Sequence, residues 1–405
     1  MAKNPIIVGL EIGTTKVCVV VAEAAPGDET RILCVGQADS RGVRKGEIVD
    51  FDAAHESLRD AIADAESKSD VTIRSAYVGI TGGHVTSLNN RGVVHLPGER
   101  NEISEDDIAE VKLRAGEVSI PTNNAFLHNF IQQYRVDGRD GVMNPVGMLG
   151  HKIEADYHIV HGVRNRIQNT IRLVREVPLE VDDVVFSGLA SALAVLDREQ
   201  RERGALVIDI GGGTTDYVIY RDGAVHDSGS IAVGGDHITN DISMGLRVPM
   251  ARAERLKIDE GGAVLGTCMP DEKIHLRGEP GFAARDIERE MLHQVIHYRL
   301  REIFELLKKR FDDERHLDYL GAGVVLTGGS SQIPGIQHLA EDVFGIPVQP
   351  AQSPPLSGLT SGLANPQIST ALGLVEYARL VQDEHPTEGF WLRMKHRFSR
   401  ALGSR

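Results

Sequence analysis

The apolar positions of the chain predict a strand-turn-strand unit that occurs twice. Residues 6–10 and 17–21 are rich in β-branched side chains and flank a Gly-Thr-Thr turn, which is typical of a β-hairpin. Residues 205–220 repeat this order of apolar strand, acidic residue, Ile-Gly, hydroxyl-rich turn and second strand. Such an internal repeat predicts two related lobes that face each other. A third apolar strand, 324–327, also runs into a glycine turn.

Helical spacing predicts several helices between these strands. Residues 52–65 are expected to form a helix with Asp52 as its N-cap, and 164–177 form a second one. A long helix is expected over 283–310, where Ile287 and further apolar residues share one face. The turn after 324–327 is expected to lead into another helix.

The segment 84–162 has a different pattern of apolar and polar residues, which predicts a small α+β insert. Strand-like runs at 92–96, 126–136 and 157–161 surround a helix start at Ser104, where acidic residues fill the first turn. The insert therefore separates two pieces of the first lobe.

Composition agrees with several lobes and excludes some partners. A chain of 405 residues exceeds the roughly 250–300 residues that one hydrophobic core serves. Its 44 basic and 58 acidic residues give a net charge of −14, which argues against a generic nucleic-acid-binding surface. Three cysteines that are far apart indicate neither a disulfide framework nor a thiolate metal site, and are typical of the cytosol. We expect no signal peptide and no transmembrane segment.

The C-terminal end differs from the rest of the chain. Residues 382–389 are polar and contain Pro and Gly, which indicates a linker, and 390–402 then show helical spacing with apolar and basic residues on different sides. Such a helix is typical of an in-plane membrane anchor on anionic lipid. A terminal helix docked on its own lobe, or a partner-binding helix, remains an alternative. The predicted membrane residues are Phe390, Trp391, Met394, Lys395, Arg397, Phe398 and Leu402.

The repeated turns suit a phosphate. Glycine and threonine at a hairpin tip let backbone N–H groups and hydroxyls approach an anion. Glu11 and Asp209 precede the two tips, where each could hold Mg²⁺ through water. The third turn, 328–330, would let a flat purine lie against bare backbone. Neither a P-loop nor a GxGxxG motif is present, so the predicted nucleotide site is of another type.

These segments carry a family resemblance. Residues 9–16 and 209–216 resemble the two phosphate motifs of the actin/Hsp70/sugar-kinase superfamily, and 326–330 resemble its adenosine motif. More narrowly, the chain resembles the FtsA family of bacterial cell-division proteins over essentially its whole length. The segments that carry this narrower resemblance are 144–147, 187–192, 234–239 and 253–257.

The resemblance implies an α/β, two-lobed actin-like ATPase fold with RNase H-like cores, and an FtsA-type 1C insert in place of actin's 1B. It also implies an ATP site with Mg²⁺ held through water by Glu11 and Asp209. Glu254 and Lys257, an i,i+3 pair, would reach the ribose and base edge, or form a solvated helix salt bridge. The implied nucleotide residues are Gly13, Thr14, Thr15, Lys16, Gly211, Gly212, Gly213, Thr214, Thr215, Glu254, Lys257, Gly328, Gly329 and Ser330.

The expected division of the chain follows the same resemblance. The parts are 1–83, 163–198 and 370–381 for the first lobe (1A), 84–162 for the insert (1C), 199–229 and 299–369 for the second lobe core (2A), 230–298 for subdomain 2B, 382–389 for the linker and 390–405 for the amphipathic helix.

The implied function is that of a structural adaptor. It would bind ATP, form head-to-tail filaments, anchor the FtsZ ring to the cytoplasmic face of the membrane at the division septum, and help recruit later division proteins. Arg299 could pair with a carboxylate of the FtsZ C-terminal peptide, or with Glu302 on its own helix. Anionic lipids are expected as partners, and nucleic acid is not. A PilM-like assembly adaptor and a small-molecule kinase of the same superfamily are the alternatives.

Turnover of ATP is expected to be weak or negligible. Ser187 and Gly188 stand where brisk ATPases of the superfamily carry a Glu-Pro or Gln that orients water. His293 and His297, an i,i+4 pair, could chelate a metal, but no HExxH motif accompanies them, and a solvated or partly buried helix face is favoured.

Overall fold

The computed structural model describes residues 5–24, 30–96, 102–278, 283–312, 316–352, 357–358 and 365–384, and every structural statement below concerns these residues. The predicted membrane helix, 390–405, lies outside them. The sequence predicts a linker that begins at residue 382, but the last described helix, α10 (Ser369–Glu384), extends past that residue. None of the described helices is both long and apolar enough to cross a membrane.

The first lobe is built on a six-stranded sheet in the order β11-β6-β1-β2-β3-β19. Strands β1, β2 and β3 form an antiparallel meander, whereas β6 and β11 run parallel to β1. Helices α1 and α3 pack on one face of the sheet and α4 and α10 on the other. The bounds are β1 Ile6–Ile12, β2 Lys16–Ala24, β3 Thr30–Asp39, β6 Ser75–Ile80, β11 Glu180–Phe186, β19 Ser357–Gly358, α1 Phe51–Ser69, α3 Arg164–Glu176 and α4 Ser187–Val195, with a small hairpin of β4 Val43–Arg44 and β5 Glu47–Ile48.

The second lobe repeats this topology. Its sheet has the order β14-β13-β12-β17-β18, with an antiparallel meander on one side and two parallel strands on the other. Apart from the short edge strand β19 of the first sheet, the two sheets have the same strand order and directions, which confirms the prediction of two related lobes. The bounds are β12 Ala205–Ile210, β13 Thr215–Arg221, β14 Ala224–Ile231, β17 Val324–Thr327, β18 Val348–Pro350, α5 Arg198–Arg203, α6 Gly235–Leu246, α7 Met250–Glu260, α8 Arg289–Asp312 and α9 Ile336–Phe344.

The insert is an antiparallel sheet, β7-β10-β8-β9, covered by helix α2. Ser104 caps α2 in a capping box with Asp107, as its sequence predicts. Gly92 on β7 allows the close packing of α2, because a Cβ there would lie 2.4 Å from the carbonyl oxygen of Val111. The bounds are β7 Thr86–His95, β8 Asn124–Val136, β9 Arg139–Val142, β10 Lys152–Val163 and α2 Glu105–Gly116.

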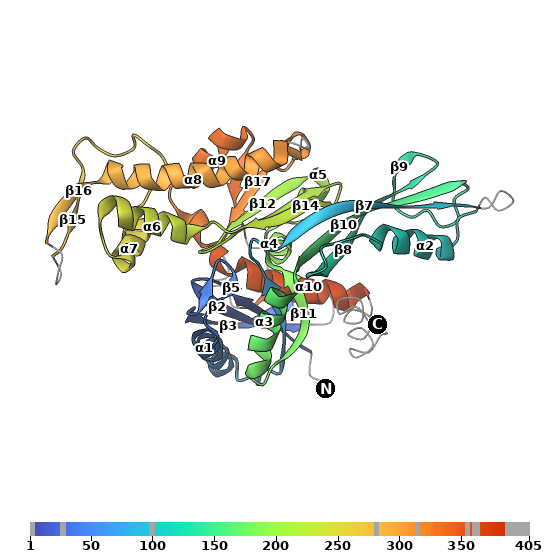
Figure 1. Cartoon of the computed structure of the whole chain (residues 1–405), viewed down its shortest axis with the longest axis horizontal. Helices are drawn as coiled ribbons and strands as arrows, with labels where there is room; N and C mark the ends of the chain where they lie inside the picture. Colours follow the sequence, from blue (N-terminus) through green and yellow to red (C-terminus); the bar gives the residue numbers. More distant parts are fainter. Residues whose placement is uncertain are drawn as a thin grey trace.

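The insert and the outer part of the second lobe lie at opposite ends of the molecule (Figure 1). At one end, β7 contacts β14 of the second lobe, where Ser87 Oγ donates to the carbonyl of Ser228 at 2.7 Å. At the other end, α6, α7 and the hairpin of β15 (Lys273–Leu276) and β16 (Arg285–Glu288) surround the outer half of α8. The two sheets with the glycine turns lie between these ends.

Two helix starts differ from the sequence prediction. The long helix α8 begins at Arg289, not at residue 283, because 285–288 pair with 273–276 as a hairpin, and Ile287 faces Ile274 there. Helix α1 begins at Phe51, and its N-cap is Asp50 rather than Asp52. The Asp50 backbone is extended, and its carboxylate accepts a hydrogen bond from the Ala53 amide at 3.1 Å.

Candidate functional site

The three glycine turns meet at a cleft of about 410 Å³ between the lobes. Its wall comes from the β1–β2 turn, the β12–β13 turn, the turn after β17, and helix α7. Of the predicted nucleotide and metal residues, Thr215 alone is not part of the lining; it is fully buried and its hydroxyl donates to the Val233 carbonyl at 2.8 Å. The lining residues predicted from the sequence are Glu11, Gly13, Thr14, Thr15, Lys16, Asp209, Gly211, Gly212, Gly213, Thr214, Glu254, Lys257, Gly328, Gly329 and Ser330.

The two hairpin tips face each other directly. Each turn is closed in the same way, by a 2.9 Å hydrogen bond from Gly13 N to the Lys16 carbonyl and from Gly211 N to the Thr214 carbonyl. A Cβ on Gly213 would lie 2.4 Å from Thr14 Oγ1 in the opposite tip. The second tip therefore needs glycine because the first tip occupies the space of a side chain.

The third turn, residues 328–330, forms another part of the cleft wall. Gly328 has a φ of 85°, a left-handed conformation that glycine adopts without strain. A Cβ at this position would also lie 2.3 Å from Asp209 Oδ1. The turn thus presents bare backbone beside the second acidic residue.

Three ionisable groups, Glu11, Lys16 and Asp209, lie close together in the cleft. The pKa of Glu11 is raised to about 7, chiefly by burial; Lys16 opposes this shift, the charge of Asp209 adds to it, and a hydrogen bond with Thr370 opposes it. Burial also raises the pKa of Asp209, against hydrogen bonds donated by Ser191 at 2.5 Å and Thr370 at 3.3 Å. Among the described residues, Glu11 Oε2 and Lys16 Nζ are buried without a hydrogen-bond partner.

These observations fit a hydrated metal ion and an anion. Mg²⁺ prefers one or two carboxylates together with water and phosphate oxygens, and Glu11 and Asp209 supply the carboxylates. An unpartnered ammonium and two glycine-rich tips suit phosphate oxygens. A buried polar atom without a partner is costly, so a ligand that satisfies both atoms would be strongly favoured.

Asp216 is a further member of the cleft that sequence reasoning left out. It is 4% exposed, and burial together with Asp209 and Glu11 raises its pKa to about 7. Thr81, at the end of β6, donates a 2.6 Å hydrogen bond to its carboxylate. The signal was present in the sequence: Asp216 closes the second motif, and a tight turn places it opposite Asp209 in the β12–β13 register.

Glu254 and Lys257 form the helix ion pair that one interpretation predicts, although Lys257 is buried rather than solvated, and their contact with a ribose stays a prediction. They form an ion pair of 2.7 Å on α7, and both line the cleft. Lys257 also donates to Thr239 Oγ1 at 2.9 Å and to the Gly235 carbonyl at 3.3 Å. The pair is thus fixed in place in the wall of the cleft.

Arg299 lies on α8, away from the cleft lining. Its guanidinium donates to Asp241 at 2.6 Å and also pairs with Glu302. The internal i,i+3 pair with Glu302 is therefore present, and a second carboxylate, that of Asp241 on α6, also pairs with Arg299. Ser187, the first residue of α4, does line the cleft, with a hydroxyl at the position expected to orient water.

Comparisons with known proteins show what the chain is similar to. The model of the family "Cell division protein FtsA" matches residues 206–373, and the model "SHS2 domain inserted in FTSA" matches residues 82–161, the region of the insert. A protein of Pseudomonas aeruginosa named cell division protein FtsA is 37% identical over 378 residues, 93% of this chain and 90% of its own.

Solved structures of the same fold are more distant in sequence. The PilM-PilN type IV pilus biogenesis complex has a chain that superposes with a TM-score of 0.63 at 15% identity, covering 92% of this chain and 98% of its own. MreB5 of Spiroplasma citri bound to ADP gives 0.57 at 16% identity, covering 95% and 99%. These likenesses show the actin-like fold.

Proposed function

The chain belongs to the FtsA family of cell-division proteins, and from this premise we propose that it is an ATP-binding, filament-forming adaptor. It tethers the FtsZ ring to the cytoplasmic face of the membrane at the septum and helps recruit later division proteins. The observation that carries the ATP site is the pair of opposed tips, with an unpartnered Lys16 ammonium and an unpartnered Glu11 oxygen between them. A relative of the same fold has been solved with ADP, which supports a nucleotide as the ligand.

In this proposal the two tips and Lys16 hold the phosphates, and Glu11 and Asp209 hold Mg²⁺ through water. The ion, when bound, neutralises phosphate charge and lets both carboxylates stay ionised near pH 7. Glu254 and Lys257 meet the ribose and base edge, and 328–330 meet the base. Because the Ser187 hydroxyl is a poor general base, turnover is weak and ATP acts as an assembly ligand.

The remaining steps concern assembly. A patch on the insert of one subunit binds a different patch on the next subunit. Because such a head-to-tail contact need not close into a ring, it yields filaments. The acidic FtsZ peptide would compete with Asp241 and Glu302 for Arg299. The amphipathic segment 390–402 would lie in an anionic membrane surface, with Trp391 and Phe398 buried among the lipid chains.

The nucleotide claim is tested by measuring binding of a fluorescent ATP analogue in Mg²⁺ and again after chelation. A Mg²⁺-dependent complex and a very low steady-state ATPase rate are expected. Recovery of no complex, or brisk turnover, would contradict the proposal. Electron microscopy of the protein with ATP on anionic lipid monolayers then tests for filaments.

The membrane claim is tested by changing Trp391 and Phe398 to Glu together. Liposome co-sedimentation should be lost, because two buried charges oppose insertion. The matched control changes two exposed apolar residues elsewhere, Met143 of the insert (89% exposed) and Met269 of the second lobe (77% exposed), to Glu, and should bind as wild type does. Retained binding by the first variant would reject the anchor.

A further inference from the structure

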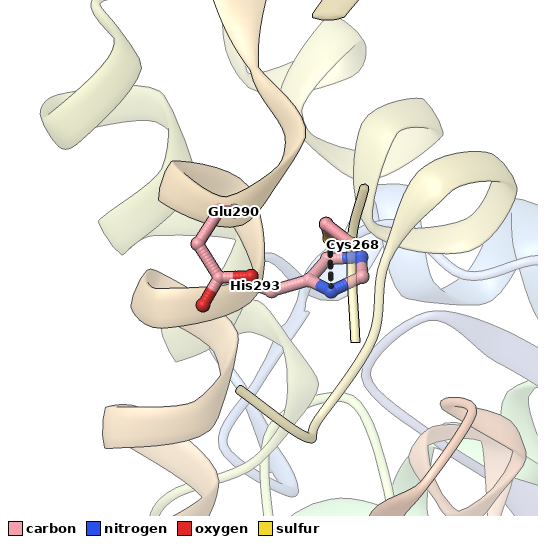
Figure 2. Close-up of side chains that lie close together, drawn as sticks. All are labelled: Cys268, Glu290 and His293. Carbon is pink, nitrogen blue, oxygen red and sulfur yellow. Dashed lines mark hydrogen bonds between the residues drawn. The ribbon is translucent and has the colours of Figure 1, made fainter. Parts of the chain in front are cut away.

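Outside the cleft lining, one side-chain cluster has the composition of a metal site. Cys268 lies in the segment between α7 and β15, while Glu290 and His293 lie one turn apart on α8 (Figure 2). One sulfur, one oxygen and one nitrogen of these residues all lie within 4.8 Å of one another. The cluster belongs to the outer part of the second lobe, and none of the proposed functions uses it.

The imidazole of His293 is oriented for a ligand. Its Nε2 lies 3.2 Å from the Glu260 carbonyl at the end of α7, and its Nδ1 lies 3.3 Å from Cys268 Sγ. A carbonyl oxygen only accepts, so Nε2 carries the hydrogen and Nδ1 of the neutral ring presents its lone pair to the sulfur. Histidines that bind metals commonly donate their other nitrogen to a carbonyl in this way. The ring is also clamped, since a Cβ on Gly262 would lie 2.7 Å from it.

Glu290 contributes an unpartnered acceptor. Its Oε1 accepts from the Gly266 amide at 3.0 Å, but its Oε2 is buried and has no hydrogen-bond partner among the described residues. The neighbouring Arg289 is engaged elsewhere, with Glu260 at 2.5 Å and Glu272 at 2.8 Å. A cation placed between Cys268 and His293 would satisfy this oxygen.

We propose that Cys268, Glu290 and His293 bind one Zn²⁺-class ion, with water in the fourth position. A thiolate, an imidazole and a carboxylate form a ligand set that favours zinc over magnesium or calcium. With a Zn–S bond of about 2.3 Å and a Zn–N bond of about 2.0 Å, tetrahedral geometry places sulfur and nitrogen about 3.5 Å apart. The Sγ to Nδ1 distance of 3.3 Å is close to this value. Binding breaks the S–H bond, forms the Zn–S bond and releases the thiol proton to solvent.

The ion would fasten the segment 261–272 to α8 and to the end of α7. That segment already contacts α8 through Gly266 and through Ala263, whose carbonyl lies 2.8 Å from His297 Nδ1. His297 is therefore engaged with backbone and is no part of the site. The true neighbours of His293 are Glu290, three residues before it, and Cys268, 25 residues before it.

The test uses the full-length protein, stripped with a chelator and titrated with Zn²⁺ and, separately, with Co²⁺. One Zn²⁺ per chain and a thiolate-to-cobalt charge-transfer band are expected. Cys268→Ser and His293→Gln should each abolish the band and weaken Zn²⁺ binding more than about 100-fold, above the loss typical of an outer-shell change. His297→Gln, on the same helix, is the matched control and should match wild type.

A second readout covers the case in which His293→Gln does not fold. Cys268 is partly exposed, whereas Cys18 and Cys34 are buried, so alkylation of the native protein reports on Cys268. Zn²⁺ should slow this alkylation in the wild type. In the Glu290→Gln variant, Zn²⁺ should slow it to a smaller extent. Absence of the cobalt band, unprotected Cys268, or equal Zn²⁺ affinity in Cys268→Ser would each overturn the proposal and leave the cluster a Cys–His hydrogen bond.

Discussion

Replacing Asp216 by Asn should make the ligand-free protein more stable at neutral pH. The carboxyl is 4% exposed, its pKa is raised from 3.8 to about 7, and Thr81 donates to it. Asn has the same shape, keeps an oxygen for Thr81 and carries no charge at any pH. The variant therefore stands for the protonated form of the wild-type side chain.

The sign follows from proton binding. The folded chain holds this proton more tightly than the unfolded chain, so the wild type loses stability as pH rises from about 4 to about 7. A shift from 3.8 to about 7 corresponds to at most about 4 kcal/mol at 1.36 kcal/mol per unit, and coupling to Asp209 and Glu11 spreads this over three groups. The free energies of unfolding of wild type and variant should be equal near pH 4. Above this pH the variant should be the more stable protein, by a difference that grows up to pH 7.

Thermal or urea unfolding without nucleotide or Mg²⁺, at several pH values between about 4 and 8, measures the difference. Burial lowers the pKa of His84 to about 4 and of His158 to about 3; these groups add stability as pH rises, but do so equally in both proteins and cancel. If the difference between the unfolding midpoints of wild type and variant stays constant from about pH 4 to 8, Asp216 is not a buried carboxyl with a raised pKa.

Two glycine replacements test the close contacts, with Gly116→Ala as the control for both, because a Cβ there meets nothing within 4 Å. Gly213→Ala places its Cβ 2.4 Å from Thr14 Oγ1 and should weaken Mg²⁺-ATP binding roughly tenfold or more, measured by titration. Unchanged affinity would argue against closure of the tips on the ligand. Gly92→Ala places its Cβ 2.4 Å from the Val111 carbonyl and should destabilise the insert by about 1–3 kcal/mol, detected as faster hydrogen exchange of α2. Equal exchange in this variant and the control would contradict the packing.

The sequence predicted what local pattern controls. The two hairpins, their acidic residues and the insert follow from apolar periodicity and turn residues, and the structure contains all of them. Prediction failed where the structure depends on long-range contacts. Residues 285–288 have helical spacing in the sequence, but they form a strand because they pair with residues 273–276. The Cys268–Glu290–His293 cluster joins segments 22 or more positions apart, so spacing along the sequence drew attention only to His293 and His297, for which a helix face was favoured over a metal site.

The internal repeat also explains why the two tips fit together. Aligning Gly13 with Gly211, whose turns close in the same way, places Thr14 and Thr15 at the positions of Gly212 and Gly213. In space the order crosses: Thr14 faces Gly213 and Thr15 faces Gly212. Two larger side chains on one tip thus meet two positions without side chains on the other, and two tips that both carried threonine could not approach this closely. The two lobes therefore share a turn but differ in its side chains: the first tip supplies Thr14, Thr15 and the Lys16 ammonium, and the second supplies two glycines followed by Thr214.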